Sequence, residues 1–310
     1  MKKFLSMMLA LLMLFAGTAL AETTDYAVTV SSPTGAPGVA LATLAVLTPD
    51  NYTYVAAEAI SAEFAKAEAD FIIAPVNAGA KLYTMGKSTY QLCAVVSWGN
   101  LYIASQREGF TLEDMNGQKV TLFAQNSINS AVVLYCLEQN GIVPAEIEYL
   151  ASASNTQALL LSDPEAIVLT AEPALTAAML KNSAITAYSV NGMYEAVTGY
   201  AGYTQAGLFV RAQTVAEHPE VVEAYLAQAA AACEGCTTDV PAAAAAAVTL
   251  GLLPNQTVAE KAIPGCSIRF VSAVEAREQL EAAANIDLSQ FGGVLPADDF
   301  YYGAKQHVEE

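Results

Sequence analysis

The residues of this sequence that could do chemistry are polar residues in loops, each placed where an expected strand ends or an expected helix begins. The candidates are Thr34, Gly35, Asn77, Asn126, Ser127 and Glu172. In an open α/β sheet, strand ends and helix N-termini converge at one edge, and ligands bind there. Because these loops contain no arginine, they suit a neutral or amine-bearing planar molecule, and a monoanion held by backbone N–H groups is the alternative.

Each of these assignments has a structural alternative. Asn126 and Ser127 precede an expected helix and could cap it without touching a ligand. Glu172 could act only as a negative charge beside a helix N-terminus. Trp98 is the single tryptophan of the chain, and we include it among the ligand-binding candidates as a stacking platform, although a core position is the commoner role of tryptophan.

Patterns for catalysis or metal binding are missing from the sequence. It contains no Gly-x-Ser-x-Gly motif, and its two histidines are His218 and His307. The five cysteines are an odd number, so at least one has no partner within the chain. Cys233 and Cys236 have the spacing of either a local disulfide or two idle thiols. We therefore expect no catalytic residue, no metal site, no cofactor and no enzymatic activity.

Strands and helices alternate along the chain, and these elements must position the candidates. Short β-rich or apolar segments predict strands at 26–31, 52–56, 70–74, 120–123, 147–150 and 166–169, most of them followed by a helix. This alternation is typical of βαβ units, in which strands run parallel and helices cover both faces of the sheet.

The alternation restarts after residues 112–117, which indicates two lobes. We predict an α/β chain in which each lobe is a mostly parallel sheet flanked by helices. The expected boundaries are 22–100 for the first part of lobe 1, 101–206 for lobe 2, and 207–310 for the second part of lobe 1 with a helical tail. The chain would cross between the lobes near 99–105 and near 207–211.

The composition predicts an exported protein that avoids nucleic acid. Thirteen Lys and Arg against 31 Asp and Glu leave a net charge of −18, which disfavours binding to phosphate backbones or anionic membranes. A basic start, an apolar run at 4–15 and small residues at 19–21 predict a cleaved signal peptide over 1–21. No cysteine stands at the expected cleavage point, so we expect a periplasmic or extracellular protein that is not a lipoprotein.

Several segments together resemble the solute-binding proteins of ABC transporters for sulfonates, nitrate and thiamine-pyrimidine precursors. They are residues 33–37, 69–75, 112–120, the pair Glu172-Pro173 and residues 295–302. The resemblance implies a type II periplasmic-binding-protein fold, a monomer that holds a small molecule between two lobes, and delivery to an ABC permease. The missing arginine departs from what a strongly anionic ligand would require.

Two other functions stay open at this point. One is an enzyme of the same fold acting in thiamine-pyrimidine synthesis, although the histidine and cysteine-rich iron motif of that enzyme has no counterpart here. The other is a ligand-sensing partner of a membrane receptor, which would need the same cleft and the same export. A response to a panel of small ligands distinguishes both binding functions from the enzyme.

Overall fold

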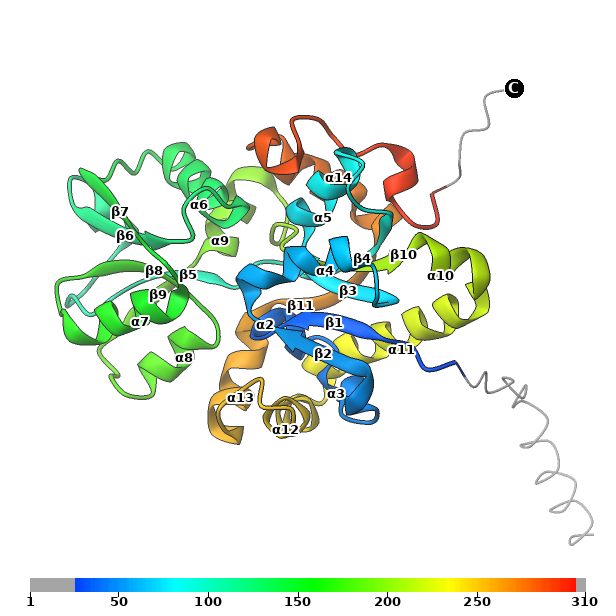
Figure 1. Cartoon of the computed structure of the whole chain (residues 1–310). Helices are drawn as coiled ribbons and strands as arrows, with labels where there is room; N and C mark the ends of the chain where they lie inside the picture. The colour runs from blue at the N-terminus through cyan, green and yellow to red at the C-terminus, as the bar shows by residue number, and fades with distance from the viewer. Residues whose placement is uncertain (1–25, 305–310) are drawn as a thin grey trace, which may run out of the picture.

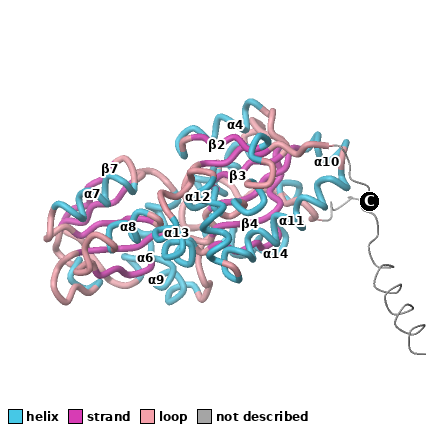
Figure 2. Tube along the Cα trace, turned by 90° about the horizontal axis from the view of Figure 1, so that it is seen from below, coloured by secondary structure: helices cyan, strands magenta, loops and turns pink. Residues whose placement is uncertain are grey.

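The computed structural model describes residues 26–304, so the expected signal peptide at 1–21 lies outside the described residues. Two β-sheets, each covered by helices, form two lobes that lie side by side (Figure 1). Figure 2 shows the same two groups of strands from below, separated along the long direction of the molecule. Within residues 26–304, no helix combines the length and the apolar character of a membrane span.

The first sheet has six strands in the order β11-β4-β10-β3-β1-β2. Their bounds are β1 Val30–Pro33, β2 Tyr52–Val55, β3 Phe71–Pro75, β4 Tyr90–Ser97, β10 Ala206–Arg211 and β11 Ile268–Ser272. β1 pairs in parallel with β2 and β3, whereas β10 is antiparallel to both of its neighbours. β11 is likewise antiparallel to β4.

The second sheet has five strands in the order β7-β6-β8-β5-β9. Their bounds are β5 Leu101–Ser105, β6 Lys119–Phe123, β7 Glu146–Leu150, β8 Ile167–Ala171 and β9 Thr186–Ser189. β6 pairs in parallel with β7 and β8, and β5 is antiparallel to β8 and β9.

The α/β fold with two lobes is confirmed, but both sheets are mixed rather than mostly parallel. Besides the edge strand β11, the antiparallel strands are β5 and β10, by which the chain enters each lobe. Both begin at the edge where their neighbours end, as the pairs Leu101 with Ala171 and Ala206 with Pro75 show. A strand that enters a lobe from the other lobe must start at that shared edge, so it runs against the strands that finish there.

The links between the sheets lie at different residues from those that the sequence predicted. β4 of the first sheet ends at Ser97 and β5 of the second begins at Leu101, so residues 98–100 form the first crossing. Residues 199–205 form the return crossing, between the end of α9 and the start of β10. The crossing expected near 99–105 coincides with the structure only at residues 99–100. Residues 101–105, and residues 207–211 of the second expected crossing, instead belong to internal strands of the two sheets, and their apolar side chains are buried.

Helices cover both faces of each sheet and supply the core contacts. In the first lobe they are α2 Ala36–Val39, α3 Ala42–Ala45, α4 Ile60–Lys66, α5 Val76–Thr84, α10 Ala212–Glu217, α11 Pro219–Thr238, α12 Val240–Thr249, α13 Gln256–Ala262 and α14 Ala273–Ala284. In the second lobe they are α6 Ile128–Gln139, α7 Ala153–Ser162, α8 Ala174–Met179 and α9 Val190–Thr198. One hydrophobic cluster runs from the first sheet through Trp98 into the second.

All five cysteines are buried and free, including the pair Cys233 and Cys236 on α11. Burial raises the pKa of the Cys136 and Cys236 thiols to about 12. Because the thiolate is the reactive form, these cysteines are poor nucleophiles in the folded chain. Of the two alternatives for Cys233 and Cys236, the structure has the idle thiols.

Candidate functional site

A cleft of about 780 Å³ lies between the two lobes. The first lobe lines it with the end of β1, the start of α2 and the β3–α5 junction, and the second lobe with the segments before α6 and α7 and the β8–α8 junction. Both crossings reach it as well, through Asn100 and Gln205. Small-molecule sites have volumes of about 300–1,000 Å³, so the cleft has room for such a ligand.

Five helices begin at this cleft, α2 and α5 from the first lobe and α6, α7 and α8 from the second. The first N–H groups of a helix have no acceptor within it. In α5, α6 and α7, six such residues line the cleft, and no backbone acceptor within residues 26–304 takes their N–H groups: Asn77 and Ala78 of α5, Ile128 and Asn129 of α6, and Ala153 and Ser154 of α7. Free N–H groups and helix dipoles together favour a negatively charged or acceptor-bearing ligand at this place.

The serines at these helix starts act as caps. The Ser127 hydroxyl accepts from Ser130 N at 3.3 Å and donates to Ala124 O at 2.6 Å. Ser152 caps α7 in the same way, accepting from Asn155 N at 3.4 Å and donating to its side-chain Oδ1 at 2.7 Å. Because both hydroxyl protons are already donated, these serines hold the helix ends in place and offer little further donor capacity.

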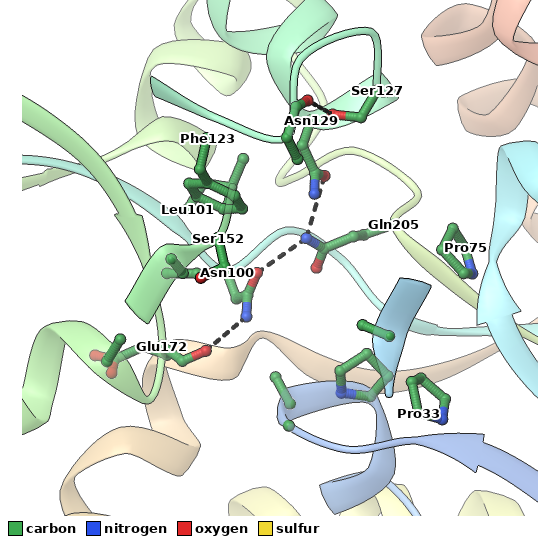
Figure 3. A pocket seen from close by; sticks show the side chains of 18 of the residues that line it. Pro33, Pro75, Asn100, Leu101, Phe123, Ser127, Asn129, Ser152, Glu172 and Gln205 are labelled. Carbon is green, nitrogen blue, oxygen red and sulfur yellow. Dashed lines mark hydrogen bonds between the residues drawn. The ribbon is translucent and has the colours of Figure 1, made fainter. Parts of the chain in front are cut away.

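A chain of side-chain amides crosses the floor of the cleft (Figure 3). Gln205 Nε2 donates to Asn100 Oδ1 at 2.9 Å and to Asn129 Oδ1 at 3.3 Å. Asn100 Nδ2 donates in turn to Glu172 O at 2.9 Å. These residues come from the two crossings, from α6 and from the end of β8. This floor network therefore joins the two lobes at the bottom of the cleft.

Two asparagines present N–H donors from opposite walls. Asn77 and Asn129 both occupy the second position of their helices, α5 and α6. Asn77 Oδ1 is enclosed without a hydrogen-bond partner in the described chain, which leaves its Nδ2 as the accessible edge. Asn129 Oδ1 accepts from Tyr203 and Gln205, which likewise leaves its Nδ2 free. Both walls therefore offer donors.

Glu172 lies at the end of β8, and its carboxylate is directed away from Asn100 (Figure 3). Its Oε1 accepts from the Thr176 hydroxyl at 2.8 Å and its Oε2 from Thr176 N at 3.1 Å. Burial raises the pKa of this carboxyl, and the two hydrogen bonds from Thr176 only partly offset it. The carboxylate is therefore engaged at the start of α8, which supports the helix-terminus interpretation of this residue.

Replacing Glu172 with glutamine is expected to change ligand affinity by less than about threefold, because its side chain already binds Thr176. The free energy of unfolding at pH 7 should stay within about 1 kcal/mol, since glutamine can still accept from Thr176 N. Because the folded pKa is raised, the wild type should lose stability relative to the variant as the pH rises from about 4 through that pKa. Calorimetry and urea unfolding measure both effects, and a tenfold loss of affinity would restore Glu172 as a ligand contact.

The structure brings six of the seven sequence candidates to the cleft: Thr34, Gly35, Asn77, Asn126, Ser127 and Glu172 all line it. Gly35 has a φ of 94°, and a side chain there would meet no atom within 4 Å, so the backbone is open to the cleft. Asn126 is exposed in a left-handed turn with a φ of 60°, which asparagine tolerates well.

Trp98 does not line the cleft. Its side chain is 1% exposed, and the Arg269 guanidinium lies 4.1 Å above its ring. Its Nε1 donates to Arg269 O at 3.1 Å. The expectation of a stacking platform is therefore not supported, because both ring and N–H are engaged in the core beside the first crossing.

Sequence reasoning missed Asn100, Asn129 and Gln205 as site residues. Asn129 stands in the helix-opening segment that the sequence did single out, so its position two residues after Ser127 was an available signal. Asn100 lies in the short link between β4 and β5, and Gln205 directly precedes β10 without following a strand. Nothing local marks them, because their place in the cleft depends on where the crossings run.

In the part of the chain that the structure describes, no cationic side chain lines the cleft, and the acidic lining residues are Glu58 and Glu172. Of these two, Glu172 is engaged with Thr176 and Glu58 is exposed. His218 stacks on Tyr26 with ring centroids 4.3 Å apart and does not line the cleft. Positive potential in the cleft comes from helix N-termini and amide groups, which carry only partial charges.

Part of the chain matches a known protein family. The model of the family described as NMT1/THI5 like matches residues 100–244. No curated protein is detectably similar to the chain.

Solved structures match over almost the whole described chain. An ABC transporter protein from Parabacteroides distasonis is 19% identical, with a TM-score of 0.77 over 90% of this chain and 99% of that one. The periplasmic aliphatic sulphonate binding protein from Escherichia coli is 15% identical, with a TM-score of 0.68 over 90% and 92%. The alkanesulfonate-binding protein from Xanthomonas axonopodis, bound to MOPS, is 14% identical, with a TM-score of 0.60 over 87% and 94%. The predicted resemblance to this group is confirmed, and the chain has the two-lobed α/β fold of these binding proteins.

Proposed function

We propose that this protein is the solute-binding component of an ABC importer, which captures a small molecule between its lobes and delivers it to a membrane permease. The observation that carries the proposal is the convergence of free helix N–H groups from both lobes on one cleft. A ligand that bonds to both walls gains contacts in the closed state that the open state lacks, and this difference drives closure. The fold shared with binding proteins of known importers supports the same role.

The ligand that suits this cleft is a small molecule with a single negative charge or a strongly accepting oxygen. Asn77, Asn129 and the helix starts all offer donors, and no arginine or lysine of residues 26–304 lines the cleft to neutralise a second charge. Of the two ligand classes that the sequence left open, this arrangement favours the monoanion over the amine. The sulphonate-binding neighbours agree with this, since a sulfonate is a monoanion with three acceptor oxygens.

A binding role without catalysis fits the cleft better than an enzyme. Among residues 26–304, the lining includes no histidine, cysteine, lysine or tyrosine that could serve as base or nucleophile. Of its two carboxylates, Glu172 is engaged with Thr176 and Glu58 is exposed to solvent. We propose that the protein acts as a monomer outside the cytoplasm, in the periplasm or beyond. Export and the permease partner rest on the expected signal peptide and on the fold.

A thermal-shift screen tests the proposal. We expect a hit among C1–C4 alkanesulfonates and carboxylates, because a ligand that binds only the native state stabilises it by about 2.7 kcal/mol at a hundredfold excess over Kd. Amines, neutral pyrimidines and inorganic sulfate serve as the comparison set. Stabilisation by amines alone would contradict the proposed ligand class, and no stabilisation by any compound would count against the binding function itself.

A further inference from the structure

We propose that Gln205 is a positioning residue for the ligand site: together with Tyr203 it holds the Asn129 amide so that its NH2 group faces the cleft as a donor. The inference rests on the proposed function and adds a specific way in which the return crossing prepares the site. Tyr203 and Gln205 belong to the return crossing, whereas Asn129 belongs to α6 of the second lobe.

The orientation of the Asn129 amide follows from its hydrogen bonds. An asparagine amide has one accepting edge and one donating edge, and rotation by a half turn exchanges them. Asn129 Oδ1 accepts from the Tyr203 hydroxyl at 3.0 Å and from Gln205 Nε2 at 3.3 Å. The half turn would set the Asn129 NH2 group against the Gln205 NH2 group, so these two donors select one orientation. The edge left for a ligand is then the donating one.

Gln205 is itself held on both sides. Its Oε1 accepts from the Ser97 hydroxyl at 3.0 Å, and its Nε2 also donates to Asn100 Oδ1 at 2.9 Å. Its backbone N–H donates to Ser97 O at 3.0 Å, and its carbonyl accepts from Val76 N at the start of α5. The side chain is thus fixed to the first lobe and to the first crossing while it reaches across to α6.

This arrangement makes the donor on the second lobe depend on the position of the return crossing. If the lobes rotate when a ligand binds, the return crossing moves with respect to α6, and the Gln205–Asn129 contact, the longer of the two bonds to Asn129 Oδ1, changes with it. The selectivity of the cleft for an acceptor-bearing ligand is therefore set partly by a residue that offers the ligand no free N–H group of its own.

A double-mutant cycle on affinity tests whether Gln205 acts through Asn129, with ethanesulfonate and butyrate as probes in titration calorimetry. Gln205→Met keeps the volume and removes the donor, and Tyr203→Phe removes only the hydroxyl; each should weaken binding about fivefold. In an Asn129→Ala background the same changes should weaken binding less than about twofold. Gln157→Met is the matched control. Gln157 lines the cleft from the second lobe, as Asn129 does, but it donates to Ala174 O and not to Asn129. Its effect on affinity should therefore be the same with Asn129 and with Ala at position 129.

The same variants without ligand test the contact independently of function. Losses of Tm for Gln205→Met and Asn129→Ala should be non-additive if the two side chains interact, and additive losses would overturn the inference whether or not a probe binds. A Gln205→Met effect that persists in full in the Asn129→Ala background would also overturn it, since Gln205 would then act through the hinge. The Tm losses could be non-additive although neither probe binds. That result would reject both the positioning role and the proposed ligand class, and the Gln205–Asn129 hydrogen bond would then have only a structural role.

Discussion

Asn129→Asp is expected to weaken the binding of a monoanionic ligand at least about 100-fold, which corresponds to about 2.7 kcal/mol. Aspartate can accept from Tyr203 and Gln205 as asparagine does, so the floor network stays intact. The substitution replaces the donating NH2 group with a carboxylate oxygen that repels the ligand anion. At the second position of α6 a negative charge interacts favourably with the helix dipole, by about 0.3–1 kcal/mol. Affinity should therefore fall while the Tm of the ligand-free protein is unchanged or rises.

Asn126→Asp is the matched control for this charge. Asn126 lines the same wall and precedes α6, but it is exposed and makes no side-chain hydrogen bond to the floor network. Water screens its charge, so we expect a loss of about tenfold or less. Calorimetry with the best hit of the screen measures both variants. Equal losses for Asn126→Asp and Asn129→Asp would mean that overall charge, and not the Asn129 donor, governs binding.

Asp70→Ala is expected to lower the free energy of unfolding by about 3–5 kcal/mol, as removal of one partner of a buried ion pair commonly does. The Asp70 side chain is 3% exposed and binds Arg211 at 3.2 Å. It also accepts from the Tyr26 and Thr214 hydroxyls at 2.7 and 2.8 Å, and from both donors of Thr29 at 2.9 Å. The variant leaves all of these donors without their acceptor. Such a loss is a large part of the total stability of a typical domain, about 5–15 kcal/mol.

The pH dependence of this effect has a defined sign. Burial acts to raise the pKa of Asp70, but hydrogen bonds from Thr29, Tyr26 and Thr214 outweigh it and hold the pKa below its usual value. A lowered folded pKa stabilises the fold above the unfolded pKa, which is about 3.9, and this contribution disappears as the pH falls through the folded pKa. The difference between wild type and Asp70→Ala in urea unfolding should therefore shrink below about pH 4.

Asp50→Ala is the control for the loss of a negative charge. Asp50 is exposed, so its removal should change the free energy of unfolding by no more than about 0.5 kcal/mol. A loss of less than about 1 kcal/mol for Asp70→Ala would contradict the assigned role of its hydrogen bonds. A difference that grows on acidification would contradict the lowered pKa.

Local patterns were enough to predict the candidates that depend on a few neighbouring residues. Ser127 caps α6 through an atom three residues away, and Asn77 stands two residues after the end of β3. Strand ends and helix starts are encoded by apolar periodicity and capping residues within a short window, and parallel strands of one lobe finish at the same edge. That is why Thr34 and Asn77 could be placed at one edge of the first lobe and Ser127 at the corresponding edge of the second. That they meet in one cleft followed from the resemblance to two-lobed binding proteins.

Contacts between residues far apart in the sequence could not be predicted from local patterns. These contacts changed the roles assigned to individual residues. Gln205 meets Asn100 across 105 residues of chain and Asn129 across 76. Trp98 was predicted at the cleft, but Arg269 covers it. Glu172 was a candidate for binding an amine, but Thr176 takes its carboxylate. Each of these outcomes depends on which side chains the crossings bring together. The hydrophobic periodicity of the sequence does not predict such contacts.

The sequence by itself determined the α/β alternation, the two lobes and the helix starts that face the cleft, because these follow from propensities and hydrogen bonds between near neighbours. Only the tertiary structure decided the direction of β5 and β10, the amide network of the floor and the donor character of the site. A strand that enters from another lobe has to begin at the shared edge, and an asparagine amide takes its orientation from distant partners such as Tyr203. Both depend on the path of the whole chain, which is a property of the folded state.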